Sequence, residues 1–357
     1  MTPWGRFFLP GPTEVRPEVL AAMNQPVIGH RGPEMTALLR QADPGLRALF
    51  RTTRPVYVST SAATGLMEAG VRCGVRKRAL ALVNGAFAER FRDLVGDCGR
   101  DCESYTVPWG EAHDPSEVER RLRAGKFDAV TVTHSETSTG VLNPLPEIAE
   151  AVRAVSDDIL LLVDGVTSVG GTRVETDAWG LDWTLTGSQK AMALPPGLAF
   201  GTASARMLER AGTMSGRGQY FDLLDFDAQW KRFQTPQTPA VNLIYALVEQ
   251  LARMEREGWE ARLARHQQMA ERCWQWAEDQ GLQLLAPAGY RSPTVTTISL
   301  PPEQLGSRVA ARLVERGYTI GAGYGKLKDA TIRIGHMGDH TVEELDALLA
   351  ELGEVLT

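Results

Sequence analysis

Short apolar runs alternate along the chain with segments of helical periodicity, and no other feature limits the possible folds as strongly. The sequence of a parallel strand is usually a continuous apolar run, because helices cover both faces of a parallel sheet. The alternation therefore predicts an α/β fold with a mostly parallel sheet covered by helices. The runs lie at residues 56–58, 79–83, 129–132 and 159–163, and helical spacing is seen at 117–122 and 147–155.

A smaller C-terminal α/β domain is predicted from the change of pattern after residue 239. A long helical stretch at 239–280, interrupted at Gly258, is followed by the expected strand 294–300, helix 305–316, strand 331–334 and a last helix from Glu343. A chain of 357 residues is long enough for one large domain and a smaller one. We therefore expect an N-terminal arm at 1–16, a large domain at 17–255 and a small domain at 256–357.

Two helix starts are indicated by proline next to a capping residue. Asp114 precedes Pro115, and Asn143 precedes Pro146. Proline is tolerated in the first turn of a helix, and an Asp or Asn side chain just before it can accept a hydrogen bond from a free amide. We therefore expect Asp114 and Asn143 to cap helices.

Charge and cysteine content exclude several classes of protein. The formal net charge of −6 supplies no broad positive field, so neither nucleic acid nor an anionic membrane is an expected partner. The longest apolar run, at 159–163, is too short to span a bilayer, and the N-terminus lacks the apolar segment of a signal peptide, which predicts a cytoplasmic protein. The 4 cysteines form neither a disulfide framework nor a zinc pattern, so no metal is expected.

Polar loops follow four of the predicted strands, where an open α/β sheet forms its ligand crevice. The loop STSAATG runs into a helical segment, so its free amides could hold a phosphate. A strand-to-helix turn without any binding role would have the same sequence pattern. The other loops are HSETSTG at 134–140, DGVTS at 164–168 and GSQK at 187–190. We expect these four loops to meet.

Asp164 and Lys190 are the two charged groups that demand an explanation. Asp164 ends an apolar run, where an unpaired charge is costly, and Lys190 follows about one helix and one strand later. The two side chains could form a structural ion pair. They could equally serve a pyridoxal phosphate site, in which a lysine forms a Schiff base and an aspartate keeps the pyridinium nitrogen protonated.

The motifs together resemble the class V aminotransferases of fold type I, the group that contains the alanine– and serine–glyoxylate, serine–pyruvate, phosphoserine and small aspartate aminotransferases. The resemblance runs nearly end to end and implies a pyridoxal 5′-phosphate enzyme of amino-acid metabolism. It rests on LPGPTEV, STSAATGLMEA, NGAFAERF, THSETSTGVL, LLVDGVTSVGG, TGSQKAMALPPG, TPQTPAVNL, SPTVTTISLP and TIRIGHMG, in that order.

The resemblance implies catalytic roles for Lys190, as the Schiff-base lysine, and for Asp164, as the partner of the pyridinium nitrogen. Phe87 falls where the family places an aromatic ring over the cofactor, although a phenylalanine in such a run is often plain core. Thr137 or Ser138 would lie near the phenolic oxygen of the cofactor.

Further cofactor contacts are implied for the phosphate. Ala62 replaces a serine that is common in the family, so one hydroxyl donor is missing there and we expect altered affinity rather than lost binding. The residues implied to hold the cofactor, besides those above, are Ala62, Ala63, Thr64, Thr167 and Gln189.

Substrate contacts and assembly are implied in the same way. Arg333 alternates with two isoleucines and has a planar guanidinium suited to a carboxylate, so it is the expected clamp for the substrate α-carboxylate. Gly11, His30 and Arg31 match segments that approach the substrate. Thr235 and Thr238 match a segment that reaches the phosphate from a neighbouring subunit, which implies a homodimer with shared active sites.

The resulting prediction is an aminotransferase that acts on small amino and oxo acids and moves the amino group of alanine or serine to glyoxylate or pyruvate. Phosphoserine or aspartate with 2-oxoglutarate is the alternative, because His30 and Arg31 could meet a distal acidic group. A non-catalytic binding protein of the same fold remains a further alternative.

Other enzyme classes fit the sequence less well. The Gly-rich stretch at 321–326 leads into a strand rather than a helix, unlike a dinucleotide loop. No serine has the glycine spacing of a hydrolase nucleophile elbow. None of the cysteines matches the mobile loop of a cysteine desulfurase.

Overall fold

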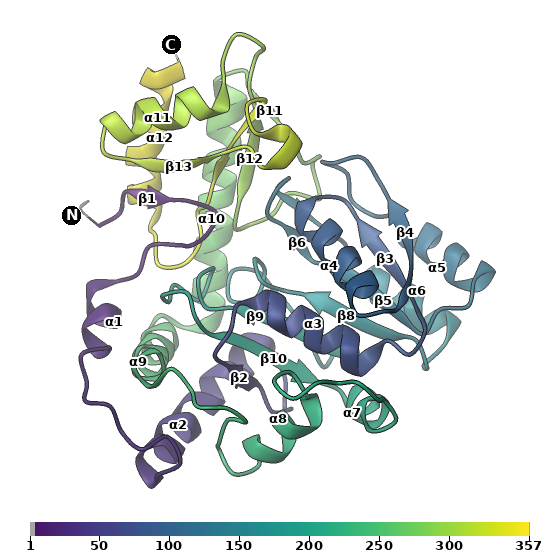
Figure 1. Cartoon of the computed structure of the whole chain (residues 1–357). Helices are drawn as coiled ribbons and strands as arrows, with labels where there is room; N and C mark the ends of the chain where they lie inside the picture. The colour runs from purple at the N-terminus through teal and green to yellow at the C-terminus, as the bar shows by residue number, and fades with distance from the viewer. Residues whose placement is uncertain (1–3, 357) are drawn as a thin grey trace.

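Two sheets with separate apolar cores organise residues 4–356, the part of the chain that the computed structural model describes (Figure 1). The strands of the large sheet are β2 (Tyr57–Ser59), β3 (Arg78–Val83), β4 (Asp101–Thr106), β5 (Ala129–Thr133), β8 (Leu160–Asp164), β9 (Trp183–Gly187) and β10 (Ala199–Ala203). The strands of the small sheet are β1 (Phe7–Phe8), β11 (Gln283–Leu284), β12 (Thr296–Ser299), β13 (Thr319–Ala322) and β14 (Thr331–Ile334). A separate hairpin pairs β6 (Ser135–Glu136) with β7 (Val141–Leu142).

The large sheet has the predicted parallel architecture. Its order is β2-β10-β9-β8-β5-β3-β4, and β10 alone among these strands runs antiparallel to its neighbours. Four of the strands, β2, β3, β5 and β8, coincide with the predicted apolar runs to within one or two residues. Because the other six strands point the same way, their carboxyl ends meet at one edge of the sheet.

Helices cover the large sheet, and two of them lead directly from its carboxyl edge. The helix α3 (Ala63–Gly74) packs on β8, β9 and β10, and α4 (Ala86–Asp97) packs on β3, β4 and β5. Figure 1 shows both in front of the sheet. The other helices of this part are α1 (Pro17–Ala22), α2 (Pro33–Phe50), α5 (Pro115–Ala124), α6 (Leu145–Val155), α7 (Ala205–Gly212), α8 (Leu223–Trp230) and α9 (Val241–Glu257).

The small sheet forms the second core together with three helices. Its order is β1-β13-β14-β12-β11. Buried residues of α10 (Trp259–Asp279), α11 (Gly306–Glu315) and α12 (Val342–Leu356) join those of the sheet in one apolar cluster. The predicted interruption at Gly258 is confirmed, because that glycine has φ +90° and separates α9 from α10.

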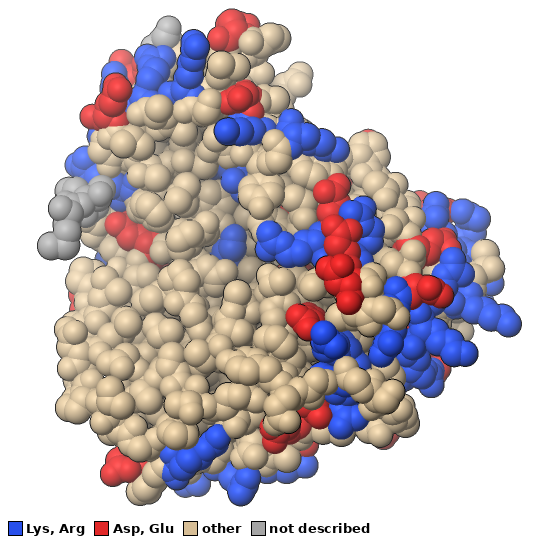
Figure 2. All heavy atoms as spheres, in the orientation of Figure 1, with Lys and Arg blue, Asp and Glu red and all other residues tan. Residues whose placement is uncertain are grey.

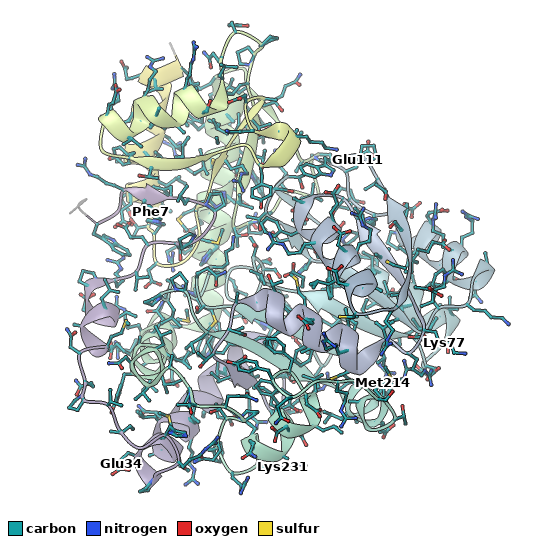
Figure 3. All side chains as sticks on the ribbon, viewed as in Figure 1. Phe7, Glu34, Lys77, Glu111, Met214 and Lys231 are labelled. Carbon is teal, nitrogen blue, oxygen red and sulfur yellow. The ribbon has the colours of Figure 1, made fainter. Side chains whose placement is uncertain are left out.

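The N-terminal segment belongs to both parts of the molecule. Phe7 and Phe8 pair in parallel with β13, which the sequence did not predict. Figure 3 shows Phe7 beside the small sheet and Glu34 at the far end of the large part, so residues 7–34 run from the small sheet past the large one. The boundaries at residues 16 and 255 stay a prediction.

The two expected helix caps have different outcomes. Asp114 caps α5 by accepting a hydrogen bond from the Ser116 amide, as predicted. The expectation for Asn143 is wrong, because its side chain donates to the Thr133 carbonyl at 2.7 Å and accepts from Asn84 at 3.2 Å. This fully buried amide satisfies groups on other segments, which a local pattern does not reveal.

None of the helices within residues 4–356 combines the length and the apolar character needed to cross a bilayer.

Candidate active site

The carboxyl edge of the large sheet brings the predicted loops together. Asp164 is the last residue of β8, and it lies in register with Thr133 on β5 and with Leu185 on β9. Lys190 follows β9 after a short turn. The predicted meeting of Asp164 and Lys190 at neighbouring strand ends is therefore confirmed.

Lys190 is buried beneath the N-terminal segment. Its Nζ donates to the Pro10 carbonyl, and its own carbonyl accepts from Thr13 Oγ1 at 3.0 Å. Gly11 has φ +118°, and a Cβ atom there would lie 2.5 Å from Lys190 Nζ, so glycine is required at this close approach. Burial lowers the pKa of Lys190 to about 7, and the positive charge of Arg333 contributes to this shift.

Asp164 is also buried, and its carboxylate oxygens and Lys190 Nζ hydrogen-bond to other groups rather than to each other. Its Oδ1 accepts from the Val166 amide at 2.9 Å, and its Oδ2 accepts from Thr133 Oγ1 at 3.4 Å. The alternative of a structural ion pair is therefore wrong. Burial raises the pKa of Asp164 to about 7, although the Val166 hydrogen bond opposes this shift.

Phe87 lies at the start of α4, and its ring centroid is 5.8 Å from Lys190 Nζ. The ring therefore lies beside the lysine, and its predicted place over the cofactor stays a prediction. The backbone around Phe87 is held by a buried carboxylate, Glu136, which accepts from the amides of Phe87 at 3.1 Å and Ala88 at 2.9 Å. Glu136 also accepts from Ser138 Oγ at 2.6 Å, which places Ser138 beside this helix start.

Arg333 reaches the same site from the small sheet. Its neighbours Ile332 and Ile334 are buried in the small core, so the alternation predicted from the sequence is confirmed. Its Nε donates to the Ala322 carbonyl at 3.0 Å, and its Nη1 donates to the Thr137 carbonyl at 3.2 Å. These bonds hold Nε and Nη1 and leave Nη2 without a hydrogen-bond partner among residues 4–356.

Thr137 connects two of the loops that the sequence singled out. Its hydroxyl lies 2.5 Å from the hydroxyl of Thr167, in the loop after β8. Both side chains are buried. The candidate cofactor residues of these two loops are therefore in direct contact.

The residues expected to hold a phosphate lie at the start of α3 and in the turn after β9. Ala62 precedes α3 in an extended conformation, and no side chain caps this helix. The first amides, at Ala63 and Thr64, are therefore available to an anion, which the positive end of the helix dipole also favours. Gln189 immediately precedes Lys190, and its carbonyl accepts from the Thr13 amide at 2.9 Å.

Four of the predicted residues lie together but are not joined to this group. Arg31 Nη1 donates to the Thr235 carbonyl, and His30 Nε2 is 3.5 Å from Thr238 Oγ1. No hydrogen bond or ion pair within the described chain links any of the four to Lys190. Their roles toward substrate and phosphate stay predictions.

Comparison with known proteins identifies the family. Residues 89–348 match the family described as aminotransferase class-V. The chain belongs to the class V aminotransferases. It is therefore an enzyme that acts on amino and oxo acids, and the predicted fold type and pyridoxal phosphate dependence are confirmed by the same family.

Class V aminotransferases similar to this chain include two curated relatives and a solved structure. The L-aspartate–glyoxylate aminotransferase of Paracoccus denitrificans is 32% identical over 99% of this chain and 93% of its own. The serine–glyoxylate aminotransferase of Methylorubrum extorquens is 32% identical over 97% of this chain and 89% of its own. The crystal structure of an alanine–glyoxylate aminotransferase from Nostoc sp. has a TM-score of 0.93 and 34% identity, covering 99% of this chain and 95% of that one.

The residues present fit the cofactor of a class V aminotransferase. A buried amine with a lowered pKa, a buried carboxylate with a raised pKa, an aromatic ring beside the amine and an uncapped helix start lie at the same sheet edge. Lys190 would hold the aldehyde carbon, Asp164 the ring nitrogen and α3 the phosphate. The Asp164 carboxylate has room for a further hydrogen bond because each oxygen has one donor.

Three residues of this aminotransferase site were missed in the sequence. Glu136 stands alone as a charged residue within HSETSTG, directly after a buried strand, and that position could have revealed it. Arg90 lies within the quoted NGAFAERF motif, and Tyr324 lies in the glycine-rich stretch that was dismissed as a dinucleotide loop. Arg90 Cζ lies 5.0 Å from the Phe87 ring centroid because the two residues are three positions apart on α4, which the helical spacing could have revealed. The Tyr324 ring, 5.3 Å from the same centroid, comes close only through the tertiary fold.

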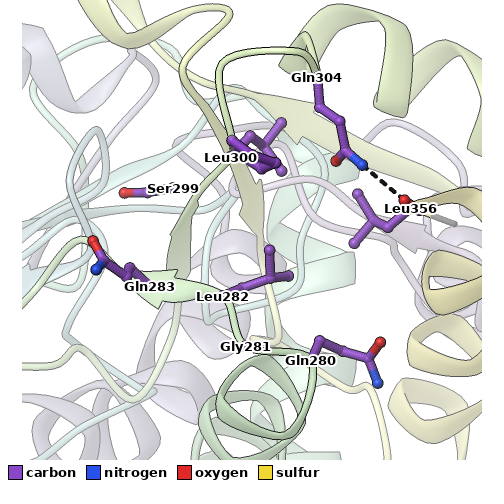
Figure 4. A pocket seen from close by; sticks show the side chains of 9 residues that line it. Gln280, Gly281, Leu282, Gln283, Ser299, Leu300, Gln304 and Leu356 are labelled. Atoms are coloured by element: carbon purple, nitrogen blue, oxygen red, sulfur yellow. Dashed lines mark hydrogen bonds between the residues drawn. The ribbon is translucent and has the colours of Figure 1, made fainter.

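Elsewhere, a cavity of about 510 Å³ lies in the small domain, lined by residues such as Gln280, Gln283 and Leu282 (Figure 4). Gln304 closes one side by donating to the Leu356 carbonyl at 2.7 Å. No acidic, basic or thiol side chain lines this cavity, and its one hydroxyl side chain, Ser299, has no base among the lining residues to activate it. Among the described residues, no cluster of His, Cys, Asp or Glu suits a metal ion.

Proposed function

We propose that this aminotransferase moves the amino group of a small L-amino acid, alanine or serine, to glyoxylate or pyruvate. The observation that carries the proposal is the single guanidinium of Arg333, fixed by two carbonyls with one nitrogen free for an α-carboxylate. The three related proteins described above support glyoxylate as the acceptor, because their names share it while their donors differ.

Lys190 is proposed as the group that binds the cofactor and then moves a proton. When bound, pyridoxal phosphate supplies an aldehyde and an electron-withdrawing ring that makes the Cα proton of an amino acid acidic. The pKa of Lys190, lowered to about 7, leaves a large share of its amine neutral near physiological pH, so Nζ can accept that proton and deliver it to a nearby carbon. Pro10 O holds the amine in place before the reaction.

Asp164 and Phe87 are proposed to hold the ring of the cofactor. Asp164 would bind the ring nitrogen and stabilise its protonated form, since a cation there compensates the cost of the buried carboxylate. Phe87 would cover one face of the ring, with its position set by Glu136. The site is therefore preorganised before substrate binds.

Aspartate is a second candidate donor because of Arg90. This residue is exposed, lies beside Phe87 and forms no hydrogen bond or ion pair within residues 4–356. A free guanidinium at the rim of the site could bind the second carboxylate of aspartate. His30 and Arg31 do not support this alternative here, because they contact the segment at Thr235 and Thr238.

A screen of single amino acids tests the function. We expect L-alanine or L-serine to remove the yellow absorbance of the lysine-bound cofactor, and glyoxylate to restore it faster than 2-oxoglutarate. The preferred donor should exceed L-phosphoserine by at least about tenfold in kcat/KM, equivalent to about 1.4 kcal/mol. D-alanine serves as the control.

Two results of this screen would contradict the proposal. If no amino acid changes the spectrum, the chain is a binding protein rather than an enzyme. If L-aspartate is the best donor and Arg90→Met lowers the rate with L-aspartate but not with L-alanine, the second candidate is correct.

We also propose a homodimer with shared active sites. The resemblance places Thr235 and Thr238 at the phosphate of a neighbouring subunit, and in this chain Thr238 and Arg31 are exposed whereas Thr235 is buried. Exposed apolar side chains, among them Leu20 and Val27, support a buried interface, as does the low density of charged groups over α1 and β2 (Figure 2).

Sedimentation of the loaded enzyme tests the assembly. We expect a mass twice the 39.0 kDa of the chain. Val27→Asp should shift the equilibrium toward monomer, because a charge would then have to be buried in the interface. A monomeric wild type with full activity would contradict the homodimer.

A further inference from the structure

A loop of the small domain, residues 323–330, lies against the candidate site and has no role in the mechanism described so far. Its Tyr324 ring packs against the Phe87 ring, with centroids 5.3 Å apart and planes inclined by 35°. The Arg333 Cζ atom lies 5.3 Å from the centroid of the same tyrosine ring. Tyr324 therefore contacts both the ring proposed to cover the cofactor and the guanidinium proposed to bind the substrate.

The loop is held in a defined conformation by its own backbone. The Gly323 amide donates to the carbonyls of Lys328 at 3.1 Å and Thr331 at 2.8 Å, and the Leu327 amide donates to the Tyr324 carbonyl at 3.0 Å. A Cβ atom at Gly323 would lie 1.9 Å from the Leu327 oxygen, so the turn depends on glycine. The loop thus presents Tyr324 from a rigid base.

A second contact attaches the same loop to the large domain. Lys326 Nζ lies 4.4 Å from the ring centroid of Trp109, which follows β4. Trp109 is itself oriented by donating from Nε1 to Glu89 at 3.3 Å. Two aromatic residues of the large domain, Phe87 and Trp109, therefore meet one loop of the small domain.

The contact with Tyr324 restricts a motion of the Arg333 guanidinium that its hydrogen bonds do not restrict, namely tilting out of its plane. Carbonyl oxygens hold Nε and Nη1 in the guanidinium plane, but in-plane bonds alone allow the group to tilt. An aromatic ring close to a guanidinium attracts it by stacking and by cation–π interaction. Its removal would leave the free Nη2 less well directed toward a carboxylate.

We propose that Tyr324 is a positioning residue that orients Arg333 relative to Phe87, so that the α-carboxylate of the amino acid is bound in register with the cofactor ring. The inference rests on the proposed function and adds to it a determinant of substrate affinity. The aromatic ring carries the role, and the phenolic hydroxyl does not, because the contacts with Phe87 and Arg333 involve the ring.

Kinetics of three variants test this inference. Tyr324→Leu should raise KM for the amino donor about tenfold while kcat changes by less than about threefold, since the ring acts on carboxylate binding rather than on proton transfer. Tyr324→Phe should behave as wild type. Lys328→Met, which removes an exposed lysine of the same loop, is the matched control, and it should leave KM within about twofold.

Cofactor affinity supplies a readout that does not depend on turnover. Quenching of tryptophan fluorescence by pyridoxal phosphate should give the same dissociation constant, within about twofold, for wild type and Tyr324→Leu, because Glu136 still holds Phe87. A Tyr324→Leu protein with weakened cofactor binding and unchanged KM would show that the ring serves the cofactor, which overturns the inference.

The remaining outcomes are equally decisive. If wild type converts amino acids but Tyr324→Leu has the wild-type KM, the inference is wrong and the proposed function stands. If wild type converts no amino acid, the proposed function is wrong, and the proposed role of Tyr324 is then wrong as well. If Tyr324→Leu does not fold, Tyr324→Met replaces it, and failure of both to fold beside a stable Tyr324→Phe would assign the ring a purely structural role.

Discussion

Lys190→Ala should lose at least about 10³-fold of the aminotransferase activity and should form no covalent bond with pyridoxal phosphate. The expected effect is large because one amine both binds the cofactor and moves the proton, and no other lysine contacts the ring of Phe87 among the described residues. Activity assays and mass spectrometry after borohydride reduction measure the two losses. Lys77→Ala, which removes an exposed lysine, should retain both properties.

The pH dependence of cofactor loading gives a second measurement of the same residue. Only the neutral amine attacks an aldehyde, and burial lowers the pKa of Lys190 to about 7 from its usual 10.5. The loading rate of wild-type apoprotein should therefore rise with pH up to about 7 to 8 and then level off. A rate that keeps rising toward pH 10 would mean that Lys190 titrates as an ordinary exposed lysine.

Asp164→Asn should lower kcat by about 10² to 10³-fold while the cofactor still binds. Asparagine has nearly the same shape and its carbonyl can accept from Val166, but it carries no negative charge to stabilise a protonated ring nitrogen. Steady-state kinetics and the absorbance of the bound cofactor measure the two properties separately. The predicted loss is thus specific to the charge.

Thermal unfolding of the apoprotein is the control for Asp164→Asn. Burial raises the pKa of Asp164, which means that its ionised form is destabilised in the folded chain. Removing the charge should therefore leave the melting temperature unchanged or raise it at pH 8. A lower melting temperature together with the loss of activity would point to a structural role for this carboxylate instead.

Much of the fold was predictable because local patterns carry it. The apolar run at 129–132 matches β5, and the helical spacing at 147–155 lies within α6. The cap at Asp114 depends only on a residue two positions away. Asn143 shows the limit of such reasoning, because its amide is used by Thr133 and Asn84 on other segments.

The core of the site was also predictable, since parallel strands that end at one edge bring their following loops together. Asp164, Lys190 and Arg333 were singled out as charged groups at the ends of apolar runs or within a strand, and the motifs supplied the family. The partners of these groups were not predictable. Lys190 donates to Pro10, which lies in a segment far from it in the sequence.

The sequence by itself determined the alternation of strands and helices, the chemical types at the strand ends and membership of the class V aminotransferases, because each depends on neighbouring residues or on motifs. The tertiary structure alone decided that Asp164 and Lys190 hydrogen-bond to other groups, that Glu136 fixes the start of α4, and that Tyr324 contacts both Phe87 and Arg333. These contacts join segments that are far apart in the sequence. Their energies depend on burial and on interatomic distance, and both are set only when the chain has folded.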